Sequence, residues 1–240
     1  MYISHAYCIL RIYDTTFTNC TSKLTNGGIY YKGRIFIGKG LCFDGCAGFS
    51  RVIHISQGYW FNCKQGQINT LNQTSVVHCG RNPNPGIDNP GVQWRGKIIS
   101  NSINSSSNTV EQNQAGLCYG FVENPTKLRF ITLSNNLGET ILHLHGFRMA
   151  DEIDYIQVIN NTAPRGLIFV INSKCLMTYT VFESNTGNLC NVEENSELHL
   201  MGSVFDKEYP IGNSTVDLQG SFLNGFTSHH IVQINCYLNS

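Results

Sequence analysis

The sequence predicts an all-β protein built as a parallel β-helix, in which each strand pairs with its equivalent one turn further along the coil. Short apolar runs recur along the 240 residues, and most start about 22–26 residues apart, a period typical of solenoids. Good helix formers are scarce, and no sustained 3.6-residue apolar stripe is present. Apolar and polar residues alternate within the runs, as in Ser196–Met201, where Leu198 and Leu200 would point inward.

The clearest repeat unit is Gly166–Asn185. It contains two strand-like runs, Leu167–Ile171 and Leu176–Phe182, joined by a polar corner at Asn172–Lys174. Similar units recur, although one step between first strands is only about 15 residues, shorter than the usual solenoid period. The predicted first strands are Gly28–Tyr31, Arg51–Ile55, Gly66–Asn69, Gly91–Trp94, Gly116–Tyr119, Thr140–Leu144, Gly166–Val170, Asn188–Val192 and Ser214–Leu218.

Other repetitive β architectures fit the sequence less well. Leucine-rich repeats would need a Leu-x-x-Leu-x-Leu signature, which is absent. A sandwich would need successive hairpins, yet Asn-Gly turns occur only at Asn26 and Asn224. We therefore predict one β-helix domain over residues 1–240, with polar or proline-rich loops projecting near 81–90 and 101–108.

The charge balance excludes one class of partner. Lys plus Arg and Asp plus Glu both number 16, so no basic surface for nucleic acid is expected. No signal peptide follows Met1, and no apolar run approaches the roughly 20 residues that a membrane span requires. Strand-like Cys8–Tyr13 begins close to Met1 and leaves no room for a cap, so we expect a fragment of a longer ectodomain or self-association through uncapped ends.

The repeat motifs resemble those of a known group of surface proteins. Asn26–Tyr31 resembles the GGAI-type element and Phe182–Asn185 matches FxxN, the paired motifs of polymorphic-membrane-protein-like β-helix proteins. Phe17–Cys20 and Trp60–Cys63 resemble the Asn-Cys rung endings of the large trichomonad family of this type. The resemblance implies a right-handed, single-stranded, pectin-lyase-like solenoid. It also implies a non-catalytic extracellular or cell-surface scaffold for adhesion, with a host-cell protein or a glycan as partner.

Two further function classes stay open. A carbohydrate-active enzyme, a polysaccharide lyase or hydrolase on the same fold, would need converging carboxylates near a basic residue. Asp151, Glu152 and Asp154, shortly after Arg148, form the densest such cluster, although Asp is also common in turns. A glycan-binding module would instead use exposed aromatic residues. Its candidates are Tyr30, Tyr59 and Trp60.

Ten cysteines are more typical of an oxidising compartment than of a reducing one. Cys20, Cys46, Cys63 and Cys79 follow second strands and have two interpretations, a disulfide framework or small packed thiols. We favour packed thiols, because rungs joined by backbone hydrogen bonds need few cross-links. Zinc is disfavoured, because the C-x3-C pair Cys42/Cys46 lacks a second pair.

Recurring polar residues at strand ends favour structural roles. Asn62, Asn135, Asn160 and Asn185 are expected to stack at turns and bond unpaired backbone groups, rather than to bind metal or glycans. His143 and His145 share one strand face but lack ligand partners, so we expect no metal and no cofactor there. Whether the sequons carry glycans is open. They lie at Asn19, Asn72, Asn104, Asn160 and Asn213.

Overall fold

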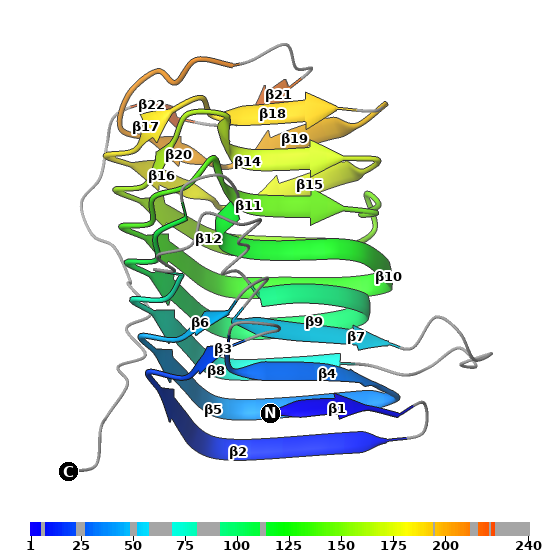
Figure 1. Ribbon diagram of the computed structural model, residues 1–240. Coiled ribbons are helices and arrows are strands. Elements are labelled where there is room, and N and C mark those ends of the chain that lie inside the picture. The colour runs from blue at the N-terminus through cyan, green and yellow to red at the C-terminus, as the bar shows by residue number, and fades with distance from the viewer. Residues whose placement is uncertain are drawn as a thin grey trace.

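The computed structural model describes most of the chain. The described residues are 1–5, 8–22, 27–48, 52–57, 69–80, 92–110, 114–193, 195–211, 216–220 and 222–223. They contain no helix, and their parallel strands stack as a solenoid that rises from β1 and β2 at one end to β21 and β22 at the other (Figure 1). The predicted all-β parallel β-helix is therefore confirmed.

Two flanks of parallel strands carry the coil. The first flank consists of β1 (Tyr2–Ser4), β4 (Ile29–Gly33), β7 (Ile53–Gln57), β11 (Thr140–His145), β14 (Gly166–Ile171) and β18 (Cys190–Glu193). The second consists of β2 (Ile9–Thr18), β5 (Ile35–Asp44), β8 (Asn69–Val77), β12 (Glu152–Ile159), β15 (Lys174–Thr178), β16 (Val181–Glu183), β19 (Glu197–Met201), β20 (Val204–Phe205), β21 (Val216–Gln219) and β22 (Phe222–Leu223).

Two long strands pass from one flank to the other without a break. They are β9 (Val92–Ser106) and β10 (Gln114–Ser134), which pair with each other and with strands of both flanks. Short pairs complete the coil at a third side. These are β3 (Thr21–Ser22) with β6 (Ala47–Gly48), and β13 (Thr162–Ala163) with β17 (Thr186–Gly187).

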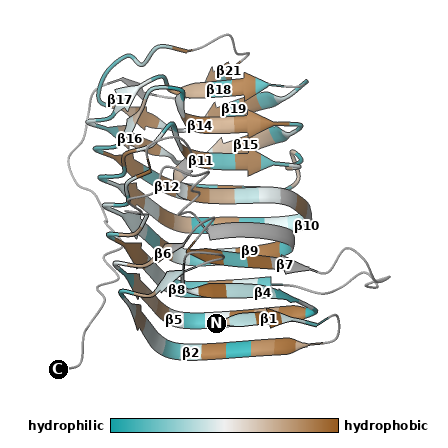
Figure 2. Cartoon of the chain, in the orientation of Figure 1, coloured by the Kyte–Doolittle hydropathy of each residue, from teal (hydrophilic) through white to brown (hydrophobic). Residues whose placement is uncertain are grey.

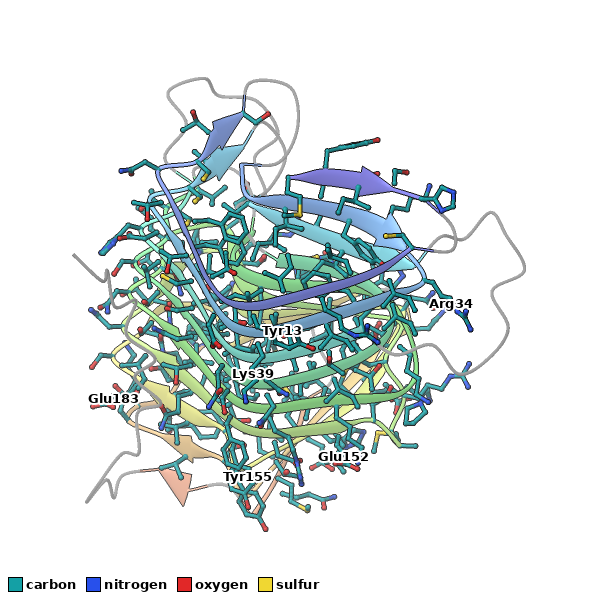
Figure 3. The ribbon with its side chains drawn as sticks, turned by 90° about the horizontal axis from the view of Figure 1, so that it is seen from below. Tyr13, Arg34, Lys39, Glu152, Tyr155 and Glu183 are labelled. Atoms are coloured by element: carbon teal, nitrogen blue, oxygen red, sulfur yellow. The ribbon has the colours of Figure 1, made fainter. Side chains whose placement is uncertain are left out.

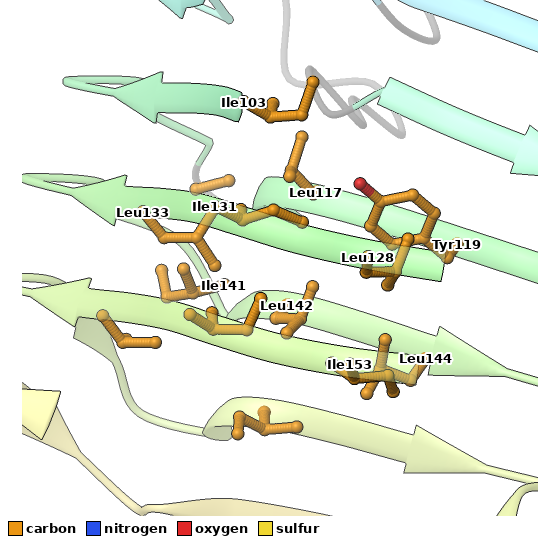
Figure 4. Close-up of a cluster of buried hydrophobic side chains, with 14 of the residues drawn as sticks. Ile103, Leu117, Tyr119, Leu128, Ile131, Leu133, Ile141, Leu142, Leu144 and Ile153 are labelled. Atoms are coloured by element: carbon orange, nitrogen blue, oxygen red, sulfur yellow. The ribbon is translucent and has the colours of Figure 1, made fainter. Parts of the chain in front are cut away.

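The interior is filled by columns of apolar side chains, one from each turn. Leu117, Leu142 and Ile168 are register partners, and all three are fully buried. Each such side chain contributes roughly 1.5–3 kcal/mol by leaving water. Figure 4 shows one part of this core, and Figure 2 shows how apolar and polar segments recur from one strand to the next.

Three parts of the predicted repeat are wrong. Ser214–Leu218 is predicted as a first strand, but its residues Val216–Leu218 lie in β21, which pairs with β19 on the second flank. Gly66–Asn69 was assigned as a first strand, but its last residue begins β8, which pairs with β5 on the second flank. The short step between first strands is explained by this misassignment. The stretch 101–108 was predicted as a projecting loop, yet residues 101–106 complete β9.

The stretch 101–106 belongs in a strand because its alternation satisfies the coil. Ile103 and Ser105 point inward and are buried, while Asn104 faces out and donates to Ser75 of β8. Polar outward positions are normal in a strand with one solvated face. The predicted loop at 81–90 lies outside the described residues.

One corner of the coil is closed by a column of buried side chains. Asn161 shows the pattern: its Oδ1 accepts from the Asn136 backbone N–H at 2.9 Å, and its Nδ2 donates to the Leu133 carbonyl at 2.8 Å. Its Nδ2 also donates to Oδ1 of Asn185. We call this the buried corner column, and its members are Cys20, Cys46, Cys79, Asn108, Asn136, Asn161 and Asn185.

The predicted bonding of backbone groups by strand-end asparagines is right for Asn185. For Asn135 and Asn160, the residue that follows has this role. Asn135 and Asn160 take left-handed φ angles, are exposed and bond each other at 2.6 Å. The residues after them, Asn136 and Asn161, supply the buried hydrogen bonds to backbone groups. The left-handed turn and the buried amide are therefore two adjacent positions. Asn62 lies outside the described residues.

Candidate binding face

A second corner of the coil carries a column of outward positions with left-handed backbone. The strands contain a series of register partners, one from each turn, that begins at Tyr13 and ends at Gln219. Each member of the column is the residue directly after one of these partners. All have φ between +44° and +66°. We call it the exposed corner column, and its members are Asp14, Gly40, Gln73, Ser102, Phe130, Tyr155, Tyr179, Gly202 and Gly220.

Three consecutive members of this column are aromatic, and their rings stack. The ring centroids of Phe130 and Tyr155 lie 5.1 Å apart with planes 9° from parallel, and those of Tyr155 and Tyr179 lie 5.2 Å apart at 17°. The three residues are 42%, 45% and 55% exposed, respectively. Figure 3 shows Tyr155 projecting from the same side of the coil as Glu152.

Aromatic residues are unexpected in these positions. A left-handed conformation costs an L-residue about 1–2 kcal/mol, and bulky side chains rarely adopt it. Stacking returns only about 0.5–1.5 kcal/mol for each pair. Gly40, Gly202 and Gly220 show that the same turn forms without a side chain. The fold therefore does not require the exposed rings of Phe130 and Tyr155.

Ion pairs lie directly beside this aromatic stack. Arg129 Nε donates to Asp154 Oδ2 at 2.8 Å, and Thr178 Oγ1 donates to the other oxygen of Asp154 at 2.8 Å. Lys127 Nζ donates to Glu152 Oε1 at 2.6 Å. The hydrogen bond with Asp154 is the main reason why the pKa of Arg129 is raised. Charged donors and acceptors therefore run parallel to the stacked rings.

The charged strip continues toward the higher-numbered end of the coil. Lys174 donates to Glu197, and this hydrogen bond is the main cause that lowers the pKa of Glu197. His199 lies between two carboxylates, with Nε2 3.7 Å from Glu197 Oε2 and Nδ1 3.2 Å from Asp217 Oδ2. Gln219 donates to the same Asp217 oxygen at 2.8 Å. This outer face therefore carries alternating charges linked by hydrogen bonds.

The three acidic residues named as enzyme candidates do not all lie on one face. Asp151 is only 4% exposed, and its carboxylate accepts from the backbone N–H groups of Thr126 and Arg148, which makes it a corner residue. Glu152 and Asp154 do lie on the outer face, two positions apart, each bonded to a cation. The structure therefore brings two of the three candidates together and assigns the third to the turn.

His143 and His145 are the partly buried residues at the end of β11, where their neighbours are buried. His143 packs edge-on against Phe169 with centroids 4.8 Å apart, and Arg165 lies 4.7 Å above the same Phe169 ring. Burial, and then the neighbouring His145, lower the pKa of His143 to about 4. Within the described residues, no cluster of three or more His, Cys, Asp or Glu side chains is arranged to hold a metal ion.

The aromatic candidates named from the sequence fall elsewhere. Tyr30 is sandwiched between Tyr2 and His54 on the first flank, with centroid distances of 4.6 and 4.9 Å. Its two ring faces are therefore already covered. Tyr59 and Trp60 lie outside the described residues.

Three cysteines of the buried corner column are free thiols in successive turns. The Cys46 thiol donates to the Phe17 carbonyl at 3.3 Å, much as the asparagines do in later turns. A hydrogen bond with Cys79 lowers the pKa of Cys46 to about 7, and the same bond raises that of Cys79. The packed-thiol interpretation is therefore correct for Cys46 and Cys79, which are buried, while Cys20 is a free thiol that is only partly buried. Cys63 lies outside the described residues.

The aromatic stack was missed in the sequence, although a signal for it exists. Phe130, Tyr155 and Tyr179 each stand six residues before an asparagine of the buried corner column. Once those asparagines are aligned, the aromatic positions align with them. When the repeat units are aligned on their apolar strands, Phe130 and Tyr155 look like ordinary strand residues.

Comparison with known proteins supplies no relative. No family model matches the chain, and neither the curated proteins nor the solved structures contain a match. The part of the chain that the structure describes has no helix that is long and apolar enough to cross a membrane.

Proposed function

We propose that this chain is a non-catalytic β-helix scaffold of the extracellular or cell-surface kind, and that it binds a glycan along the exposed corner column. The observation that carries the proposal is the stack of Phe130, Tyr155 and Tyr179. These exposed rings occupy strained backbone positions that the fold fills elsewhere with Gly, Asp, Gln or Ser. Strain that the fold does not need points to a role in binding.

A glycan suits this surface better than a charged polymer does. The chain has no formal net charge, so it offers no field that would attract nucleic acid. The strip beside the rings offers both donors and acceptors, from Arg129 and Lys127 to Asp154 and Glu152. Sugar hydroxyls can pair with either kind of group, while their C–H faces pack on aromatic rings.

A surface location is part of the same proposal. It is supported by the resemblance of the Phe17–Cys20 and Phe182–Asn185 motifs to those of surface β-helix proteins. The sequon residue Asn19 is exposed at a corner and is accessible for modification. Antibody labelling of intact cells from the source organism tests the location. Signal only after permeabilisation would reject it.

The binding proposal is tested with a printed array of pyranose oligosaccharides. The control replaces Phe130, Tyr155 and Tyr179 together with Asn, which tolerates the left-handed backbone and removes the rings. We expect specific signals for the natural chain and at least a tenfold loss for the triple variant. No signal for the natural chain, or equal signals for both proteins, contradicts the proposal.

A carbohydrate-active enzyme is the second candidate, and one observation favours it. Glu152 and Asp154 lie on one outer face with Lys127 and Arg129 one turn away, which is a convergence that acid–base chemistry could use. Release of reducing ends from a panel of polysaccharides tests this. Activity that is lost in both Glu152→Gln and Asp154→Asn would establish the enzyme and displace the scaffold proposal.

A further inference from the structure

The aromatic stack ends where the exposed corner column loses its side chains. After Tyr179, the next two members are Gly202 and Gly220, with φ of +62° and +58°. A Cβ atom placed on Gly202 would lie 3.3 Å from Cδ1 and Cε1 of Tyr179. Among the described residues, nothing lies within 4 Å of a Cβ placed on Gly220. Within the part of the chain that the structure describes, the exposed corner column therefore has no side chain beyond Tyr179.

The two faces of the Tyr179 ring are in different surroundings. One face stacks on Tyr155, while the ring atoms Cδ1 and Cε1 lie close to Gly202, which has no side chain. At the other end of the stack, Phe130 is followed by Ser102, which keeps a side chain. The stack therefore has one end that a flat ligand can extend.

Polar groups stand beside Gly202 and Gly220. Gln219 immediately precedes Gly220, and its amide donates to Asp217 Oδ2 at 2.8 Å. Asp217 in turn lies 3.2 Å from His199. The Gly202 backbone N–H is already bonded to the Gln219 carbonyl at 3.0 Å, so the backbone here is rigid. A ligand at this point meets an aromatic face together with fixed donors and acceptors.

We propose that a pyranose ring of the bound glycan stacks on the exposed part of the Tyr179 ring, beside Gly202 and Gly220, where the column has no side chain, with its hydroxyls bonded to Asp217 and Gln219. This inference rests on the proposed function and names the subsite within it. The sugar extends the stack at a spacing close to the 5.2 Å that separates Tyr155 from Tyr179.

The surroundings favour a sugar over a cationic side chain of a protein partner. The carboxylates nearest the stack already have partners: Asp154 bonds Arg129 and Thr178, and Asp217 bonds Gln219. A guanidinium would therefore gain little from Asp154, which Arg129 already neutralises. Asp217 keeps its charge, because Gln219 is a neutral amide, and can accept a hydrogen bond from a sugar hydroxyl. A pyranose brings an apolar face for the ring and neutral hydroxyls for the polar groups, and neither requires a counter-charge.

A matched pair of substitutions tests the subsite. Gly202→Tyr adds a ring after Tyr179 at nearly the φ that Tyr155 and Tyr179 adopt, and the Tyr179 ring must shift by a few tenths of an ångström to admit its Cβ. Ser102→Tyr makes the same kind of change at the opposite end of the stack. Binding of both variants is titrated by calorimetry against soluble trisaccharides of glucose, galactose, mannose and N-acetylglucosamine. We expect at least a tenfold weaker affinity for Gly202→Tyr and less than a twofold change for Ser102→Tyr.

The outcomes separate this inference from the proposed function. Binding that survives Gly202→Tyr unchanged, or that is lost equally in Ser102→Tyr, overturns the subsite and leaves glycan recognition standing. Absence of binding by the natural chain on the array and in solution overturns both. If Gly202→Tyr fails to fold, Tyr179→Asn removes the ring instead, and retained affinity in that variant overturns the subsite.

Discussion

The two corner columns of this coil stack one side chain per turn in opposite surroundings. In the buried corner column, Asn108, Asn136 and Asn161 are each 1% exposed, and their amides bond the backbone of neighbouring turns. In the exposed corner column, Tyr155 and Tyr179 are about half exposed. Among the described residues, their hydroxyls form no hydrogen bond with a backbone group.

The difference separates stability from recognition. An inward polar side chain must satisfy buried backbone groups, so its identity is dictated by the fold. An outward side chain at a strained corner has no such obligation, and we propose that the aromatic residues there serve contact with a ligand. On this proposal the same repeat supplies a structural column and a binding column.

The largest expected effect is in the buried column. Asn161→Ala leaves the Asn136 N–H and the Leu133 carbonyl unpaired, and each buried orphan costs about 1–3 kcal/mol. We expect a loss of about 3–5 kcal/mol in urea unfolding. The adjacent Asn160→Ala, at an exposed turn, should cost about 1 kcal/mol or less. Equal losses would contradict the distinction between the columns.

His143 tests an outward residue that is nevertheless substantially buried. Because burial lowers its pKa to about 4, the unfolded chain takes up a proton near pH 6.5 that the folded chain does not. Stability should therefore fall as the pH drops from about 6.5 toward 4, by about 2 kcal/mol. His143→Phe should remove this part of the pH dependence. An unchanged profile in the variant would assign the acid sensitivity to other groups.

Extending the asparagine column into the thiol region should stabilise the fold. Cys79 occupies the place that Asn108 occupies one turn later, and its thiol donates to the Val77 carbonyl at 3.1 Å and to the Phe43 carbonyl at 3.6 Å. Cys79→Asn replaces these with amide hydrogen bonds worth about 1 kcal/mol. Thermal unfolding should show a higher midpoint. Cys79→Ala, the control, should lower it.

The smallest effect on stability is expected in the exposed column. Tyr155→Asn loses two stacking contacts and relieves a left-handed aromatic residue, and these terms nearly cancel. The free energy of unfolding should change by less than about 1 kcal/mol. A loss above about 3 kcal/mol would show that the stack holds the fold together.

Much of the fold could be predicted from the sequence because apolar and polar residues alternate within its strands. The run Leu167–Ile171 and the alternation of Leu198 with His199 appear in β14 and β19 as expected. The stretch 101–108 misled because Ser and Asn outnumber apolar residues there, and only Ile103 marks the inward face. A strand with one solvated side needs few apolar residues when neighbouring strands bond its backbone.

The candidate site could not be predicted, because it depends on register between turns. Nothing local distinguishes Tyr155 from any other strand tyrosine. Its position becomes meaningful only when it stands between Phe130 and Tyr179 with a left-handed backbone. Gly202 also gives no signal in the sequence, because its effect comes from having no side chain.

The central claim is that the exposed column binds and the buried column stabilises. The most direct measurement compares Tyr179→Asn with the natural chain for both glycan affinity and the free energy of unfolding. We predict that affinity falls at least tenfold while the free energy of unfolding changes by less than about 1 kcal/mol. Unchanged affinity, or a loss of affinity explained by unfolding of the variant, would contradict the claim.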